Sequence, residues 1–257
     1  MGIAAISYDS PKILRDFAKR QKISLPLISD PGSKAIRAWG LINESYKDRP
    51  DRYGIPHPGV FILDSNGVII EKHFEESHRE RQSASGIVVA EIDLPGDSIE
   101  IATDQFRVET FPSSPEVFPG HRIGLVLEFE MGENLHAYAP GEHTYRPLNV
   151  TLEPSSLIRV DELIRPESTM YHFEPFDETV QAYEGSFRLV QEVTLLVNDE
   201  VREIMSSDDR TIEIQATLSY QVCSDSVCYP PDEADVRWRF DVRPLEMERV
   251  PEELQKK

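Results

Sequence analysis

The sequence predicts two folded parts, an α/β part followed by an all-β antiparallel sandwich. Residues 1–86 alternate strand-like and helix-like apolar patterns, whereas residues 102–245 carry short alternating strands separated by proline and glycine. A chain of 257 residues, 39% of them hydrophobic, is long enough to form two cores. We expect residues 87–101 to be an acidic linker and residues 246–257 to be a charged tail.

The first part begins with a buried-strand pattern over residues 2–7 and continues into a helix that ends near Lys22. Ser10 is placed to cap this helix, and Pro11 fits its first turn because the proline needs no backbone donor there. A second strand is expected over residues 24–29. This order of strand, helix and strand is typical of an α/β fold.

A second helix is expected to begin after residues 30–33, with Gly40 just beyond its last turn. Residues 59–63 form a third apolar strand pattern. The polar residues 64–67 then predict a hairpin turn into a fourth strand over residues 68–73. The first part should therefore end in a β-hairpin.

The second part has almost no helical periodicity, so we expect it to consist of strands. Short strands at regular spacing with proline and glycine turns are typical of an antiparallel sandwich. The expected strands include residues 122–130, 148–152, 187–197, 210–221 and 236–242.

The formal charge of −19 argues against a nucleic-acid or anionic-membrane partner, because both require a basic surface. No stretch of apolar residues is long enough to predict a membrane span. The start of the sequence lacks a basic region, and its apolar run is short, so it does not resemble a signal peptide.

The chain contains two cysteines, Cys223 and Cys228, at the two ends of a short loop between expected strands. Their Cα atoms should lie within the distance of about 5.5–6 Å that a disulfide spans. A disulfide closing so short a loop would remove only about 2 kcal/mol of unfolded-chain entropy, which favours a pair that cycles over a structural staple. A redox-active pair, an inert disulfide and two unpaired thiols all remain open. Zinc would need two more ligands, so no metal or cofactor is expected.

Three segments of the first part, residues 6–11 (ISYDSP), 25–31 (LPLISDP) and 58–64 (PGVFILD), occur in series. Together they resemble the AhpC/TSA peroxiredoxin branch of the thioredoxin superfamily over residues 2–84. The resemblance implies a thioredoxin-like fold that is incomplete, because the family's reactive cysteine precedes the strand that begins at Gly2 here. This part therefore has no peroxidatic cysteine, no resolving cysteine and no clear active-site arginine.

Pro58 is the position that matches the family, where a proline before this strand is commonly cis and faces the reactive cysteine. We expect a cis His57–Pro58 bond, the alternative being a trans proline that simply enters a strand. The incomplete fold has two explanations. A coding sequence started at an internal methionine is favoured over a degenerate remnant, because losing a central strand would expose unpaired backbone.

The segments 220–223 (YQVC) and 228–231 (CYPP), with residues 134–141 and 182–185 upstream, carry a second resemblance. They resemble the periplasmic N-terminal domain of the DsbD thiol:disulfide interchange protein over residues 102–243. This resemblance implies an immunoglobulin-like sandwich whose two cysteines exchange a disulfide with thioredoxin-like domains.

By these resemblances Cys223 and Cys228 are the catalytic pair, with Tyr229 and Pro58 in supporting positions. The expected function is thiol–disulfide exchange by a redoxin or peroxiredoxin-like protein in antioxidant defence, with a thioredoxin-like protein or dithiol donor as partner. The alternative is a non-catalytic binding module with a structural disulfide and a degenerate thioredoxin-like remnant. The chain would be an oxidoreductase enzyme if the missing N-terminal part is present in the native protein. The compartment stays open, since the DsbD resemblance indicates an extracytoplasmic location and the missing signal peptide the cytoplasm.

Four further features lie close to the cysteines or in the family-like segments. Residues 171–176 are interpreted as a loop that shields the cysteines or as an ordinary packed turn. His136 is interpreted as a satisfied structural histidine in preference to a proton donor. Asp225 should raise the thiol pKa by charge repulsion. Tyr229 either shields the sulfur of Cys228 or covers the sandwich edge.

Overall fold

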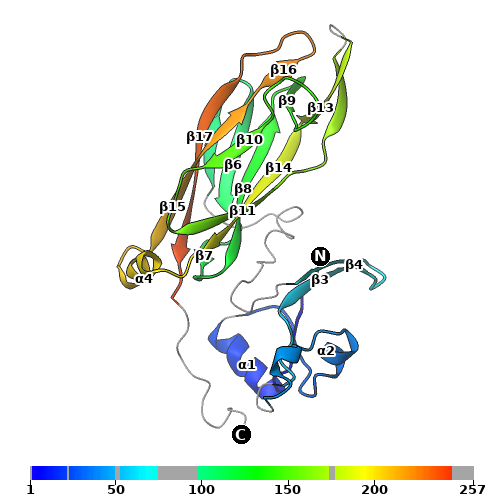
Figure 1. The fold of residues 1–257 in the computed structure, drawn as a ribbon, viewed down its shortest axis with the longest axis vertical. Coiled ribbons are helices and arrows are strands. Elements are labelled where there is room, and N and C mark those ends of the chain that lie inside the picture. Colours follow the sequence, from blue (N-terminus) through cyan, green and yellow to red (C-terminus); the bar gives the residue numbers. More distant parts are fainter. Residues whose placement is uncertain (1, 22, 50–52, 75–97, 174–176, 245–257) are drawn as a thin grey trace. The chain divides into compact units, whose positions relative to one another are not determined.

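The structure is a computed structural model, in which far more of the described residues are in β-strands than in helices (Figure 1). The described residues are 2–21, 23–49, 53–74, 98–173 and 177–244. They divide into two compact units, one within residues 2–74 and one within residues 98–244.

The first unit opens with a parallel pair of strands, β1 (Ala5–Ser7) and β2 (Leu27–Ser29), joined by helix α1 (Pro11–Arg20). The Ser10 side chain accepts a hydrogen bond from the Ile13 N–H, so the expected cap of this helix is confirmed. Both strands are shorter than expected, and the helix ends two residues earlier. The two strands therefore form only a narrow sheet.

Helix α2 (Lys34–Ala38) has an unusual start. Ser33, at its N-cap, has a left-handed backbone with φ 51° and makes no side-chain cap. The Asp30 carboxylate instead accepts hydrogen bonds from two N–H groups of the helix. Gly40 follows the helix with φ 70°, which confirms the expected glycine after the last turn.

A β-hairpin formed by β3 (Gly59–Leu63) and β4 (Ile69–Phe74) follows the short 3-10 helix η1 (Glu44–Tyr46). Gly67 adopts φ 81° in the turn, a conformation that glycine accepts without strain. The expected cis bond before Pro58 is wrong, because no described peptide bond is cis. The trans isomer is the intrinsically favoured one, and the chain's two cysteines both lie in the other unit.

The second unit is a sandwich of antiparallel sheets with one parallel pair, β17 with β7 (Figure 1). One layer is a five-stranded sheet in the order β11-β14-β8-β6-β5, and the others are β10-β15-β17-β7 and β12-β13-β9-β16. The strands of the five-stranded sheet are β11 (Ile158–Ile164), β14 (Ser186–Leu195), β8 (Arg122–Met131), β6 (Phe106–Pro112) and β5 (Ile99–Ala102). The remaining strands are β7 (Glu116–Val117), β9 (Leu135–Tyr138), β10 (Asn149–Leu152), β12 (Thr169–Phe173), β13 (Glu178–Glu184), β15 (Thr211–Tyr220), β16 (Val222–Ser224) and β17 (Asp232–Val242).

The sandwich has one main core between its layers. Alternate residues of β8, such as Leu125 and Leu127, join Trp238 and Phe240 of β17 in a single buried cluster. The Trp238 Nε1–H donates to the Val126 carbonyl at 2.8 Å, so a hydrogen bond also links the layers. Tyr220 and Val222 belong to this core, so it holds the start of the strand that carries Cys223.

Helix α4 (Asp199–Ser206) was not expected from the sequence. The Asn198 side chain accepts from the Val201 N–H, and two acidic residues follow in the first turn. Val201 is fully buried and anchors the helix to the sandwich. The cap and the acidic first turn are the local signals that could have predicted this helix.

Candidate redox site

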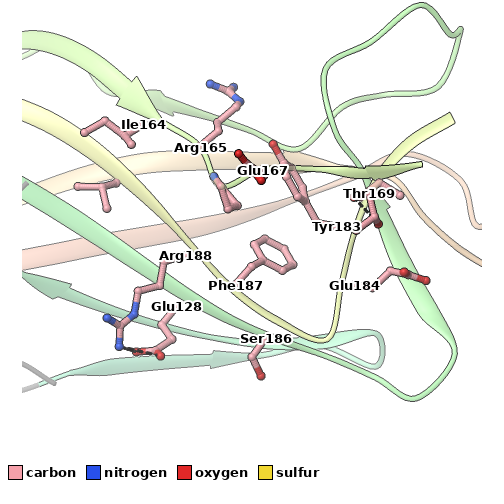
Figure 2. Close-up of a pocket in the computed structure, with 13 residues that line it drawn as sticks. Glu128, Ile164, Arg165, Glu167, Thr169, Tyr183, Glu184, Ser186, Phe187 and Arg188 are labelled. Atoms are coloured by element: carbon pink, nitrogen blue, oxygen red, sulfur yellow. Dashed lines mark hydrogen bonds and ion pairs between the residues drawn. The ribbon is translucent and has the colours of Figure 1, made fainter. Parts of the chain in front are cut away.

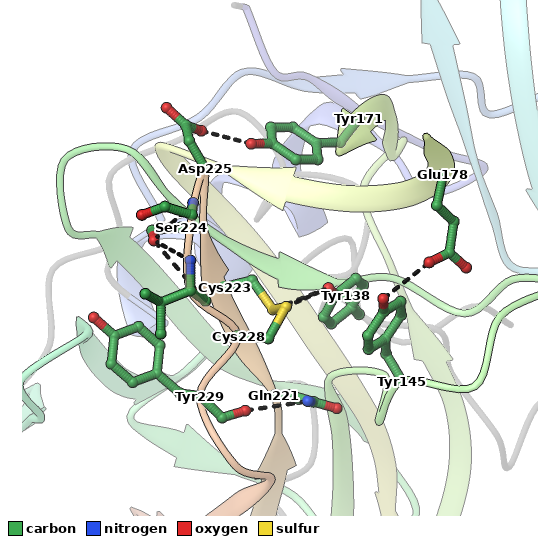
Figure 3. Close-up of a disulfide and its surroundings, with 12 residues drawn as sticks. Tyr138, Tyr145, Tyr171, Glu178, Gln221, Cys223, Ser224, Asp225, Cys228 and Tyr229 are labelled. Carbon is green, nitrogen blue, oxygen red and sulfur yellow. Dashed lines mark hydrogen bonds between the residues drawn. A yellow bond between two sulfur atoms is a disulfide. The ribbon is translucent and has the colours of Figure 1, made fainter. Parts of the chain in front are cut away.

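The two cysteines form a disulfide at one end of the sandwich (Figure 3). Their Cα atoms are 4.1 Å apart, closer than the expected separation. Backbone hydrogen bonds on either side of the pair join Ser224 N to Val227 O (2.8 Å) and Tyr229 N to Val222 O (3.0 Å). Cys223 and Cys228 are thus directly opposite at a non-hydrogen-bonded position of a hairpin, where Cα atoms approach most closely.

The two sulfur-bearing residues differ in their exposure to solvent. Cys223 lies in β16 and is 0% exposed, whereas Cys228 is partly exposed. Cys223 packs with Tyr138 and Val180 in a small apolar cluster separate from the main core. An external reactant can therefore approach Cys228 more directly than Cys223.

Tyr138, at the end of β9, points its hydroxyl at the disulfide (Figure 3). Its Oη lies 2.9 Å from Cys223 Sγ and 3.5 Å from Cys228 Sγ. The ring stacks on Tyr145 with centroids 4.2 Å apart, and the Tyr145 hydroxyl donates to Glu178 at 2.9 Å. Burial and then the neighbouring Tyr145 raise the pKa of Tyr138 far above its usual value. Tyr138 is therefore a hydrogen-bond donor at any physiological pH.

His136 is the residue directly opposite Cys223 in the β9–β16 pairing. It is 1% exposed, and its ring lies 3.9 Å from that of Tyr171. Burial lowers the pKa of His136, and the charge of Asp225 opposes this only in part. His136 is buried as expected, but its Nε2 has no hydrogen-bond partner in the described structure, so it is not a satisfied histidine.

Tyr171 lies in strand β12, where the sequence suggested a loop. Its hydroxyl donates to the Asp225 carboxylate at 2.5 Å, which links β12 to the loop between the cysteines (Figure 3). Residues 174–176 of the expected shielding segment lie outside the described residues. Tyr229 is 36% exposed at the edge of the hairpin. Pro58 belongs to the other unit.

The Tyr171–Asp225 hydrogen bond predicts a specific pH dependence. This bond, with burial and the Asp225 charge, raises the pKa of Tyr171 to about 12. The contact should stay intact below the ordinary tyrosine pKa of about 10 and be lost as the pH rises through about 12. In the Asp225→Asn variant, the Tyr171 pKa measured from its ¹³Cζ shift by NMR should fall towards the ordinary value. Asp177→Asn, at a side chain that is 97% exposed, is the control. An unchanged Tyr171 pKa in Asp225→Asn would contradict the assignment.

Sequence reasoning did not single out Tyr138, Tyr145 or Glu178. Tyr138 lies in the family-like segment 134–141, but nothing in that segment indicates that it meets Cys223, 85 residues further along the chain. The contact depends on the register of β9 against β16, and no local pattern encodes such a register.

A pocket of about 500 Å³ lies elsewhere on the sandwich (Figure 2). Tyr183 and Phe187 lie side by side in its wall, and Arg188 is ion-paired with Glu128 at 3.0 Å. Neither cysteine lines the pocket, so it is not part of the redox site.

Within residues 2–21, 23–49, 53–74, 98–173 and 177–244, no group of three or more histidine, cysteine and acidic side chains is arranged to hold a metal ion. No helix in these ranges combines the length and apolar character needed to cross a membrane.

The second unit is a β-sandwich that carries a half-buried disulfide in a hairpin, and its family match places it among thiol–disulfide redox domains. The chain belongs to the family described as "Thiol:disulfide interchange protein DsbD, N-terminal", which matches residues 108–238, about half of its length. Residues 1–72 match the AhpC/TSA family. Both resemblances inferred from the sequence are therefore confirmed.

Similar proteins were found for each part of the chain. The chloroplastic peroxiredoxin Q of Sedum lineare is 31% identical over 90 residues, which are 32% of this chain and 45% of the relative. A putative peroxiredoxin of Mycobacterium tuberculosis is 32% identical over 74 residues, 27% of this chain and 44% of the relative. The chain thus spans less than half the length of these relatives.

Two solved structures resemble the chain. The reduced N-terminal domain of Neisseria meningitidis DsbD has 16% identity and a TM-score of 0.31, covering 44% of this chain and 74% of that one. The N-terminal periplasmic domain of Proteus mirabilis ScsB has 17% identity and a TM-score of 0.35, covering 55% and 49%.

Proposed function

We propose that this protein exchanges disulfides with a thioredoxin-like protein or another dithiol donor through Cys223 and Cys228. The unequal exposure of the two cysteines indicates which of them the partner attacks. Cys228 is partly exposed and Cys223 is fully buried, so the partner thiolate attacks Cys228. Tyr229 follows Cys228 directly and is 36% exposed, which supports a role for its side chain beside the path of approach.

The exchange proceeds in two balanced steps. A thiolate of the partner attacks Cys228 Sγ, a bond forms between the two proteins, and the Cys223–Cys228 bond breaks with its electron pair on Cys223 Sγ. The partner's second thiolate then attacks the partner's sulfur in the mixed disulfide. This forms a disulfide within the partner and releases Cys228 as a thiolate. The partner leaves oxidised and this protein is reduced; the reverse sequence oxidises it again.

The rival function, a binding module with a structural disulfide, is less well supported. The disulfide closes a loop that backbone hydrogen bonds already hold on both sides, so it adds little as a staple. Family membership also favours exchange, since the matched family is that of a thiol:disulfide interchange protein.

For the first unit, we propose an incomplete thioredoxin-like domain over residues 1–86, joined by a linker (87–101) to the sandwich (102–245) and followed by a charged tail (246–257). The AhpC/TSA match and the parallel β1–α1–β2 arrangement support this proposal. Peroxide reduction in antioxidant defence would need a peroxidatic cysteine from outside this sequence, with Pro58 in the supporting position.

Thiol exchange can be tested by mixing the oxidised chain with a reduced thioredoxin and separating the quenched products by mass spectrometry. Equilibration with glutathione should give a reduction potential of about −180 to −270 mV, the range of exchanging pairs. The double variant Cys223→Ser/Cys228→Ser is the control and should leave the thioredoxin reduced. No exchange, together with a potential below about −300 mV, would show that the disulfide is structural.

A further inference from the structure

In the described structure, the hydroxyl oxygen of Tyr138 lies within hydrogen-bond distance of both sulfur atoms of the disulfide. The disulfide carries no S–H, so the single O–H of the phenol is the only possible donor between Tyr138 and the sulfurs. The shorter of the two, at 2.9 Å, goes to the buried sulfur of Cys223, and the longer, at 3.5 Å, goes to Cys228. The hydroxyl is thus aimed mainly at the sulfur that an external thiol cannot reach.

Attack on Cys228 creates a charge where water is excluded. When the bond between the cysteines breaks, the electron pair stays on Cys223 Sγ, and Cys223 is 0% exposed. A buried thiolate is costly unless a donor stabilises it. Hydrogen bonds to charged acceptors are about twice as strong as neutral ones, so a donor already in place stabilises the thiolate more than the disulfide.

We propose that Tyr138 is a catalytic residue of the exchange, whose O–H donates to Cys223 Sγ and stabilises the thiolate that leaves when a partner thiolate bonds to Cys228. This inference rests on the proposed function and adds a residue that acts on the reacting atoms. Tyr138 keeps its own proton throughout, so it stabilises charge and transfers no proton.

The neighbours of Tyr138 hold its ring in this orientation. Tyr145 lies parallel to it, with an interplanar angle of 3°, and Glu178 accepts the Tyr145 hydroxyl. The His136 ring also packs against Tyr138, with the two ring planes nearly perpendicular and the centroids 5.5 Å apart. These contacts make Tyr145 a positioning residue, because it reaches the sulfur only through Tyr138.

The first test measures thiol pKa values in the full chain. Cys228→Ser leaves Cys223 as the sole thiol, and Cys223→Ser leaves Cys228, because the chain has two cysteines. Adding Tyr138→Phe should raise the pKa of Cys223 by about one unit, read from its ¹³Cβ shift by NMR, and that of Cys228 by less. Tyr220→Phe is the matched control, since Tyr220 is equally buried and its hydroxyl contacts Asp232 instead of sulfur. Equal shifts at both cysteines, or none, would overturn the proposal.

The second test measures the rate at which dithiothreitol reduces the disulfide. Tyr138→Phe should slow this reduction about three- to tenfold, because a leaving thiol of higher pKa leaves more slowly, whereas Tyr220→Phe should not slow it. If wild-type protein exchanges with thioredoxin but Tyr138→Phe reduces at the wild-type rate, this inference fails and the proposed function stands. If wild-type protein does not exchange, the proposed function fails, and the Cys223 pKa still decides whether Tyr138 stabilises the thiolate.

A third measurement needs no substitution at Tyr138 and covers the case in which Tyr138→Phe does not fold. In wild-type protein reduced by dithiothreitol, the ¹³Cζ signal of Tyr138 should move as Cys223 ionises, with the same apparent pKa as the Cys223 signal. A Tyr138 signal that does not follow Cys223 would overturn the proposal.

Discussion

Cys228 should react with the neutral reagent 4,4′-dithiodipyridine about a hundredfold faster than Cys223 when each is the only thiol in the chain. The variant Cys223→Ser leaves Cys228 as that thiol, and Cys228→Ser leaves Cys223. Cys223 is fully buried, so its reaction requires a local opening of the hairpin, whereas Cys228 is already partly exposed. A hundredfold difference corresponds to about 2.7 kcal/mol of opening free energy. Stopped-flow absorbance gives both rates directly.

Unfolding removes the structural cause of this asymmetry and provides the control. In concentrated guanidinium chloride the two single-cysteine variants should react at rates within about threefold of each other, because burial no longer distinguishes them. Native rates that differ by less than about tenfold would contradict the assignment of Cys228 as the attacked residue.

The largest stability effect is expected at Trp238. Replacing this residue by alanine should lower the free energy of unfolding of the sandwich by about 3–5 kcal/mol, because it leaves a cavity in the main core. It also leaves the Val126 carbonyl without the indole N–H that links the two layers. Urea unfolding followed by far-UV circular dichroism measures the change without relying on tryptophan fluorescence.

Val160→Ala is the matched control for this experiment, since Val160 lies in β11 of the same sandwich and is 54% exposed. Its unfolding midpoint should stay close to that of the wild-type chain. If Trp238→Ala and Val160→Ala unfold at the same urea concentration, Trp238 is not a central core residue.

Much of the fold could be predicted because its signals are local. Helix α1 follows from the cap at Ser10 and the proline after it, and β3 has the predicted bounds, Gly59–Leu63. Helix α4 has a comparable cap at Asn198, but the helix is only eight residues long and lies between two long strands, so its apolar pattern was not recognised as helical. The cis isomer expected at Pro58 came from family resemblance, and the local preference for trans prevailed.

The candidate site was only partly predictable. The closeness of Cys223 and Cys228 in space follows from their closeness in sequence, because they are five positions apart on the two sides of one hairpin. The surroundings do not follow, since His136 and Tyr138 reach the disulfide through the register of β9 against β16. Tyr171 was interpreted as part of a shielding loop or a packed turn, yet the pairing of β12 with β13 makes it part of a strand.

The hairpin that carries the cysteines also bears on how fast the site can cycle. Its backbone hydrogen bonds lie on both sides of the disulfide and involve neither cysteine's own N–H nor carbonyl. Breaking the sulfur–sulfur bond therefore requires no change in strand pairing. If the proposed exchange takes place, the same hairpin would serve both the oxidised and the reduced state, and the reorganisation energy between the two states would be small.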